Sequence, residues 1–148
     1  MGFPVQDISR LEELATGFSE HSSGILDGCM LALDGFGVPT RQPFDWEVER
    51  PQDYRFRKGG FAIIVLAGCD SKARFICASC SHSGSTNDII AWQDSELFEA
   101  IEVEKLLLTK YFIIGDEAFN CTNQMLSPWP GKIFFTYLIL YYILIKLF

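Results

Sequence analysis

The chain has 148 residues, of which 49% are hydrophobic and 14% aromatic, and its net charge at pH 7 is -7. This composition supports one domain with a hydrophobic core and excludes a mostly disordered chain. The acidic balance argues against binding nucleic acid through overall charge, but it leaves a local basic patch or bound cations as routes to phosphate. The odd number of cysteines and the lack of a secretory signal predict a reducing, intracellular location.

The first half of the chain predicts a helix, a strand and a long loop. Residues 8–19 have apolar side chains at helical spacing. The apolar run at 29–33 predicts a buried strand that ends in a turn at Asp34-Gly35. Residues 39–59 are polar and contain three prolines, which is typical of a surface loop. Its basic cluster, Arg55, Arg57 and Lys58, is either solvated or in contact with phosphate.

The second half predicts a hairpin, a helix and a further strand. Residues 61–69 and 74–80 are two strands around a turn at 70–73. Ser85 and Asp88 have the spacing of a capping box, which predicts a helix to about residue 100. A third strand covers 111–114 and ends at Gly115-Asp116. Three tryptophans are interpreted as packing residues: Trp46, Trp92 and Trp129.

Residues 132–148 differ in composition from the rest. They are almost entirely large apolar and aromatic residues without a helical or strand period. The apolar stretch is shorter than the roughly 20 residues that a membrane-spanning helix needs. We interpret this segment as an aberrant tail, with membrane association through residues 133–145 as an alternative.

Three aspartates stand where a predicted strand ends or a predicted helix begins: Asp34, Asp88 and Asp116. Strand ends at one edge of a sheet converge, so these carboxylates can share a hard cation such as Mg²⁺ or Mn²⁺. Two such ions would assist phosphodiester cleavage. Each aspartate also has a purely structural reading, as a turn residue at Asp34 and Asp116 and as a helix cap at Asp88.

Five segments in series resemble the motifs of Harbinger-type transposases and their domesticated relatives. They are CMLALDG (29–35), YRFRKGGFAIIVLAGCDSKARF (54–75), SGSTND (83–88), IIGDEAF (113–119) and MLSPWPG (125–131). A single motif such as Leu-Asp-Gly carries no information, but five in the same order are specific. The resemblance defines a helical lead-in at 1–24, a partial nuclease domain at 25–131 and the tail at 132–148.

The resemblance implies an α/β, RNase H-like fold, in which a mixed sheet is flanked by helices and is incomplete at its C-terminal end. It also implies divalent-metal ligands at Asp34, Asp88 and Asp116. Asp34 and Asp116 would be the two aspartates of the catalytic triad, and Asp88 an auxiliary ligand. DNA would be the substrate, a separate DNA-binding protein a partner, and the nucleus the location.

The departure from the family pattern that matters most concerns the catalytic glutamate. The family has its catalytic glutamate on a helix beyond the Pro-Trp-Pro-Gly segment, whereas no glutamate follows Glu117 here. We therefore expect a transposase-derived nuclease domain with impaired catalysis. The alternatives are a non-catalytic remnant that binds metal or a partner, and a membrane-associated fragment held by its tail.

Overall fold

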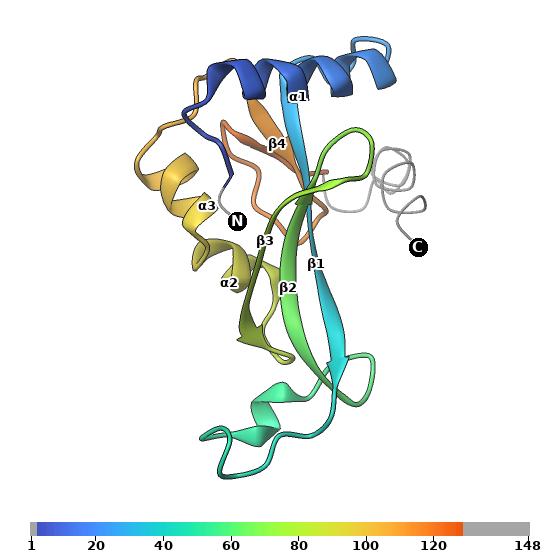
Figure 1. Cartoon of the computed structure of the whole chain (residues 1–148), viewed down its shortest axis with the longest axis vertical. Coiled ribbons are helices and arrows are strands. Elements are labelled where there is room, and N and C mark those ends of the chain that lie inside the picture. The colour runs from blue at the N-terminus through green and yellow to red at the C-terminus, as the bar shows by residue number, and fades with distance from the viewer. Residues whose placement is uncertain (1–2, 129–148) are drawn as a thin grey trace.

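Continuous apolar segments in the middle of the chain form a five-stranded mixed sheet in the computed structural model, which describes residues 3–128 (Figure 1). The strands are β1 (Cys29–Thr40), β2 (Phe61–Cys69), β3 (Phe75–Ser83), β4 (Phe112–Ile114) and β5 (Met125–Leu126). The helical elements are α1 (Ile8–His21), the 3₁₀ turn η1 (Pro51–Tyr54), α2 (Asp88–Gln93), α3 (Glu96–Phe98) and the π-helical turn η2 (Glu99–Val103). The prediction for residues 132–148 and the interpretation of Trp129 lie outside the described residues.

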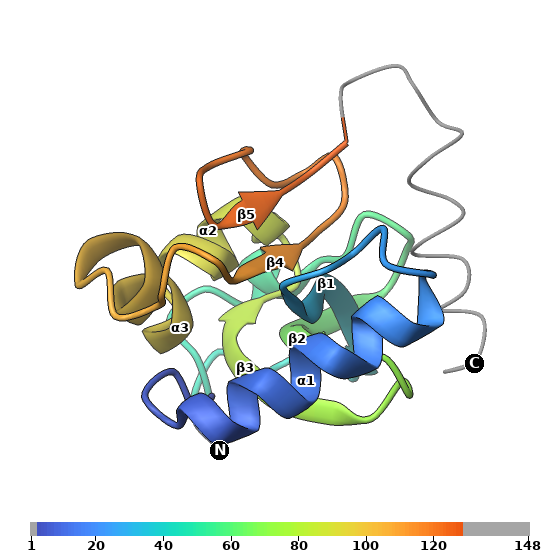
Figure 2. The same ribbon diagram turned by 90° about the horizontal axis from the view of Figure 1, so that it is seen from above.

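The order of the strands in the sheet is β3-β2-β1-β4-β5. β1, β2 and β3 pair antiparallel, as the predicted hairpin requires, and β4 then crosses to the other side of β1 and pairs with it in parallel. The helices α2 and α3 form the connection between β3 and β4 (Figures 1 and 2). The predicted α/β fold, with a mixed sheet and flanking helices, is confirmed and is consistent with an RNase H-like arrangement.

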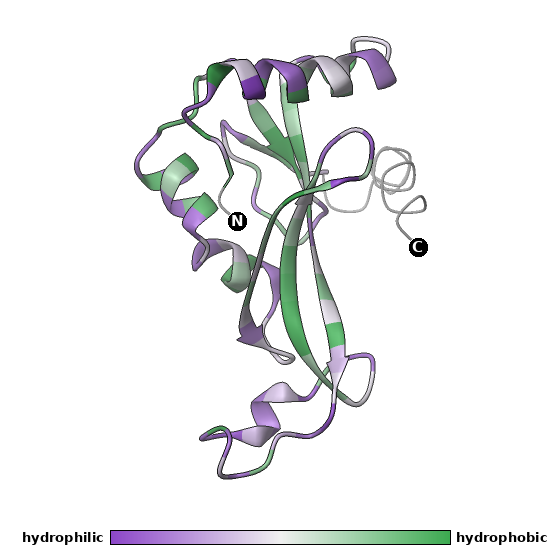
Figure 3. Cartoon of the chain, in the orientation of Figure 1, coloured by the Kyte–Doolittle hydropathy of each residue, from purple (hydrophilic) through white to green (hydrophobic). Residues whose placement is uncertain are grey.

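Helix α1 lies across one end of the sheet, and the polar segment at 41–60 lies at the opposite end (Figure 1). Asp7 caps α1, because its side chain accepts a hydrogen bond from the backbone N–H of Arg10 at 3.1 Å. Leu11, Leu14 and Phe18 are buried on one side of the helix, as their spacing predicts. Figure 3 shows the contrast between the apolar strands and the hydrophilic 41–60 segment.

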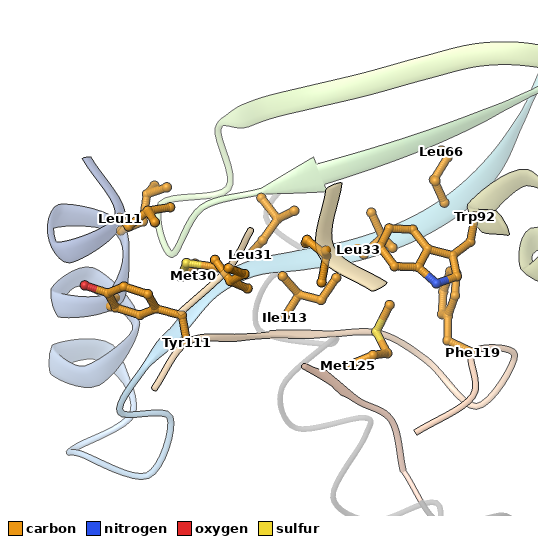
Figure 4. Close-up of a cluster of buried hydrophobic side chains, with 14 residues drawn as sticks. Leu11, Met30, Leu31, Leu33, Leu66, Trp92, Tyr111, Ile113, Phe119 and Met125 are labelled. Atoms are coloured by element: carbon orange, nitrogen blue, oxygen red, sulfur yellow. The ribbon is translucent and has the colours of Figure 1, made fainter. Parts of the chain in front are cut away.

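The main core cluster joins α1, the central strands and α2 (Figure 4). Leu31, Leu33 and Ile113 are almost completely buried at its centre. Trp92 of α2 covers one side and is 3% exposed, so its interpretation as a packing residue is correct. That interpretation is wrong for Trp46, which is 79% exposed and stacks on Phe44 at the surface.

Two predicted boundaries are wrong. Asp34-Gly35 is not a turn, because β1 continues through it to Thr40 and pairs with β2 along that whole length. The helix predicted from the Ser85 capping box to about residue 100 is divided at Ser95. The Ser95 hydroxyl accepts a hydrogen bond from the N–H of Phe98 at 3.1 Å and so starts a new helix. Among residues 3–128, no helix is both long and apolar enough to cross a membrane.

Candidate metal centre

Asp34 lies within β1, where the central strand passes from the buried core to the groove described below. The residues before it, from Cys29 to Leu33, are all buried, whereas Asp34 is half-buried. Its Oδ1 accepts a hydrogen bond from the backbone N–H of Gly35 at 2.8 Å. Asp34 therefore lies within a fixed strand rather than in the turn that its sequence suggests.

Asp116 is brought to Asp34 by the parallel pairing of β1 and β4. Ala32 of β1 is the partner of Ile114 of β4. Asp34 and Asp116 each follow these partners by two residues, so both are on the same side of the sheet by strand alternation. The Oδ1 of Asp116 accepts a hydrogen bond from the N–H of Ala118 at 2.9 Å, which fixes the turn after β4. Glu117 is exposed.

The charge of Asp116 acts on Asp34. Burial raises the pKa of the Asp34 carboxyl, and the negative charges of Asp116 and Asp88 raise it further. The hydrogen bond from Gly35 and the charge of Lys58 oppose these effects, and the resulting pKa is about 6. A cation bound near Asp34 would offset the cost of burying its ionised carboxylate and the repulsion between the carboxylates.

Asp88 is the first residue of α2, but it does not cap the helix. The cap is Asn87, whose side chain accepts a hydrogen bond from the N–H of Ile90 at 2.9 Å. The predicted capping box of Ser85 and Asp88 is therefore wrong, and Asp88 is free of that role. Burial raises the pKa of Asp88, and the charge of Asp116 raises it as well.

The Asp88 carboxylate lies directly against the backbone of β1. A Cβ atom added to Gly35 would be 2.1 Å from Oδ1 of Asp88, so only glycine fits at this position. Consecutive strand residues point to opposite faces, so Asp88 approaches β1 from the face opposite to the Asp34 side chain. Within residues 3–128, no three Asp, Glu, His or Cys side chains are close enough together to hold one metal ion.

The donor chemistry fits a hard divalent cation held by two carboxylates. Mg²⁺ usually takes one or two carboxylates and completes its octahedral shell with water and phosphate oxygens. Asp34 and Asp116, each two residues beyond the paired Ala32 and Ile114, are the carboxylates that the register brings to one face of the sheet. Asp88 lies on the other side of the same strand, and its position suits an auxiliary role better than a shared first ligand.

An open groove of about 900 Å³ runs along β1 on the side of Gly35 and Asp88. Its floor contains Gly35 and Gly37, one wall contains Ser85 to Asp88, and the other contains Arg55 to Lys58. Asp34 and Ala118 also line it. The sequence analysis identified the aspartates and the basic cluster, but it did not identify the two glycines of the floor. Gly35 and Gly37 alternate with Phe36 directly after Asp34, so both glycines lie on the same face of the strand. Two glycines on one face of a strand indicate that other chain segments pack closely against it.

The family model described as "DDE superfamily endonuclease" matches residues 33–133, which include all three aspartates. No curated protein and no solved structure matches the chain. The family acts on DNA and generally uses divalent metal ions. Because the match covers more than half of the sequence, the chain belongs to the DDE superfamily of endonucleases.

Proposed function

We propose that this protein is a transposase-derived domain of the Harbinger type, which binds a divalent cation through Asp34 and Asp116 and acts on DNA phosphodiesters. The observation that carries the proposal is the parallel register of β1 and β4, which puts these two aspartates on one face of the sheet. The raised pKa of Asp34, caused by burial and by the charge of Asp116, supports it. Location in the nucleus and a separate DNA-binding partner are parts of the same proposal.

Each aspartate has a distinct part in the proposed site. Asp34 is held by the pairing of β1 with Ala67 of β2, and Asp116 is held by the turn after β4. Asp88 lies across β1 and adds negative charge without sharing the same face. A bound Mg²⁺ or Mn²⁺ would polarise the phosphodiester and lower the pKa of an attacking water. The chain itself supplies the two carboxylates, and Asp34 also lines the groove along β1.

A second function, metal binding without cleavage, is favoured by one observation. Within residues 3–128, Asp34, Asp88 and Asp116 are not arranged as a set of three around one ion. Such a protein would bind a cation at Asp34 and Asp116 without a third carboxylate on the same ion.

Titration calorimetry with Mg²⁺ and Mn²⁺ tests the proposed site. We expect the wild-type chain to bind either ion weakly, and we expect Asp34→Ala and Asp116→Ala to abolish the binding heat. Asp27→Ala is the matched control, because Asp27 is an exposed aspartate in the turn before β1. Binding that is equal in Asp34→Ala and in the wild type would overturn the proposal.

A further inference from the structure

Three basic side chains that line the groove form no ion pair with the described carboxylates. Six basic residues in the described part of the chain form ion pairs with described carboxylates: Arg10, Arg41, Arg50, Arg74, Lys105 and Lys110. Arg55, Arg57 and Lys58 form none with residues 3–128 and are exposed, although all three line the groove. We call these three residues the basic wall.

The basic wall is held in a fixed place by the residue at its centre. A Cβ atom added to Gly37 would be 2.6 Å from Cζ of Phe56, so the phenyl ring lies directly on the glycine floor. The N–H of Gly59 donates to the carbonyl of Phe56 at 2.9 Å, and the N–H of Phe56 donates to the carbonyl of Gly60 at 3.0 Å. Gly59 and Gly60 have φ values of 101° and 74°, which glycine adopts readily. This tight turn presents Arg55, Arg57 and Lys58 on a rigid base.

The two walls are also joined to each other. The backbone N–H of Ser85 donates to the carbonyl of Asp53 at 2.8 Å. A Cβ atom added to Gly84 would be 2.5 Å from the carbonyl oxygen of Tyr54, so the two chain segments are in close contact. The segment that leads into Asp88 therefore packs against the segment that leads into the basic wall, and the width of the groove is set by backbone contacts.

The charges of the two walls act on each other across the groove. The charges of Arg57 and Lys58 oppose the burial and the Asp116 charge that raise the pKa of Asp88. Neither cation forms a direct ion pair with Asp88. A groove lined by both basic side chains and carboxylates suits an anionic ligand. Such a ligand can bind the basic side chains and can also coordinate a metal ion that the carboxylates hold. A phosphodiester has both properties.

We propose that Arg55, Arg57 and Lys58 bind the phosphate backbone of the DNA strand that enters the groove lined by Asp34 and Asp88. This inference rests on the proposed function, because that function makes DNA the substrate. Phosphate contacts of this kind position a duplex without reading its sequence. They also explain how a chain with a net charge of -7 can approach DNA, since the positive charge needs to be only local.

Fluorescence anisotropy with a labelled mixed-sequence DNA duplex tests the proposal, with the full 148-residue chain in EDTA so that no cation bridges to the carboxylates. We expect Lys58→Gln to lower the affinity about tenfold at low salt and to reduce the slope of log K against log salt by about 0.9, which is the value for one lost phosphate contact. Lys58→Arg should restore both the affinity and the slope.

Lys72→Gln is the matched control. Lys72 is also an exposed lysine without an ion pair among residues 3–128, and it lies in the turn between β2 and β3, outside the groove lining. The substitution changes the net charge by the same amount as Lys58→Gln. If the basic wall is specific, Lys72→Gln binds DNA like the wild type. If both substitutions weaken binding equally, or if neither does, the proposal is overturned.

A second variant tests the anchor rather than the charges. Phe56→Ala keeps Arg55, Arg57 and Lys58 but removes the ring that packs on Gly37. We expect a lower DNA affinity with an unchanged thermal unfolding temperature of the core, and an unchanged affinity would contradict a fixed wall.

The Mg²⁺ titration in the absence of DNA distinguishes the two proposals. Loss of DNA binding in Lys58→Gln with normal Mg²⁺ binding supports the basic wall, whereas normal Mg²⁺ binding with no effect of Lys58→Gln overturns only this inference.

Discussion

The carboxylate of Asp88 lies against the backbone of Gly35, so closely that a Cβ atom at position 35 would be 2.1 Å from Oδ1 of Asp88. The contact joins the start of α2 to the central strand next to Asp34. Asn87, not Asp88, caps α2. The Asp88 carboxylate is therefore held at this position by its packing against Gly35. Gly35 is therefore a positioning residue for one wall of the groove.

Gly35→Ala is expected to displace Asp88 and narrow the groove. Overpacking of this kind usually costs about 1–3 kcal/mol, so we expect the protein to fold with a lower unfolding temperature. Its affinity for Mg²⁺ should fall, because Asp88 no longer adds its charge at the same place. Thermal unfolding and calorimetry on the same sample measure the two effects.

The double variant Gly35→Ala/Asp88→Ala separates crowding from other causes. Asp88→Ala removes the oxygen and carbon atoms that lie closest to the added Cβ. We expect Gly35→Ala to cost clearly less in this background than in the wild type. Equal costs in both backgrounds would show that the side chain of Asp88 is not what excludes alanine from position 35.

Asp34→Asn is expected to stabilise the protein at neutral pH. Burial and the Asp116 charge raise the pKa of Asp34 from 3.8 to about 6, so the folded state binds more protons than the unfolded state between these values. The stability of the wild type therefore falls as the pH rises from about 4 to about 6. At pH 7 the substitution should raise the free energy of unfolding by on the order of 1 kcal/mol, after solvent screening is allowed for.

Urea unfolding of the wild type and Asp34→Asn at several pH values checks this prediction. The advantage of the variant should shrink as the pH falls through 6 and should be absent below about 4, where Asp34 is protonated in both states. A variant that is less stable than the wild type at pH 7 would mean that the ionised carboxylate is stabilised by the fold.

Asp70 is expected to stabilise the turn of the β2–β3 hairpin. It is 2% exposed, and its carboxylate accepts hydrogen bonds from the backbone N–H groups of Lys72 and Arg74, each at 2.9 Å. The guanidinium of Arg74 donates to it as well, at 2.8 Å. Burial raises the pKa of Asp70, but these hydrogen bonds outweigh burial and hold it below its ordinary value.

Asp70→Asn should lower the free energy of unfolding at pH 7 by on the order of 2 kcal/mol, because an amide replaces an ionised acceptor of several hydrogen bonds. The stabilisation by Asp70 is present above its unfolded pKa and is lost as the pH falls through the lower folded value. The difference between the variant and the wild type should therefore narrow in acid. Asp53→Asn, which breaks an exposed ion pair with Arg50, is the control and should change stability little.

The 148-residue chain is expected to show no metal-dependent cleavage of DNA. Among residues 3–128, no third carboxylate lies close enough to share one ion with Asp34 and Asp116, and the lack of a group that completes a metal site can reduce the rate by orders of magnitude. Nicking of supercoiled plasmid in Mn²⁺ measures this, with Asp34→Ala and Asp116→Ala setting the background. Nicking by the wild type that disappears in Asp116→Ala would show that another group completes the site.

Much of the fold follows from local patterns in the sequence. The apolar spacing of α1 and the apolar runs of β2 and β4 are strong signals, and each produced the expected element. Asp34-Gly35 is different, because a dipeptide that favours turns is held in a strand by its pairing with β2. The helix is divided at Ser95 because the Ser95 hydroxyl caps a new helix. The apolar spacing of the surrounding residues, taken alone, predicts one continuous helix.

The site could be predicted only in part for a similar reason. Placing Asp116 beside Asp34 requires the parallel register of β1 and β4, which joins residues more than 80 positions apart and has no local signal. Likewise, the contact between Gly35 and Asp88 depends on how α2 packs on the sheet. The positions of the three aspartates at predicted strand and helix ends suggested a shared site, and the resemblance to a family made that prediction much stronger.

Paramagnetic broadening of amide NMR signals by Mn²⁺ tests most directly whether Asp34 and Asp116 hold the cation. At a small fraction of one equivalent, we predict that the signals of Gly35 and Ala118, next to these aspartates, disappear first. The signals of Gly24 and Ala73, in distant turns, should persist, and Asp34→Ala should abolish the selective loss. Broadening centred on the acidic turn at Glu99 and Glu102, or loss of Gly35 and Ala118 that is unchanged in Asp34→Ala, would contradict the proposed metal centre.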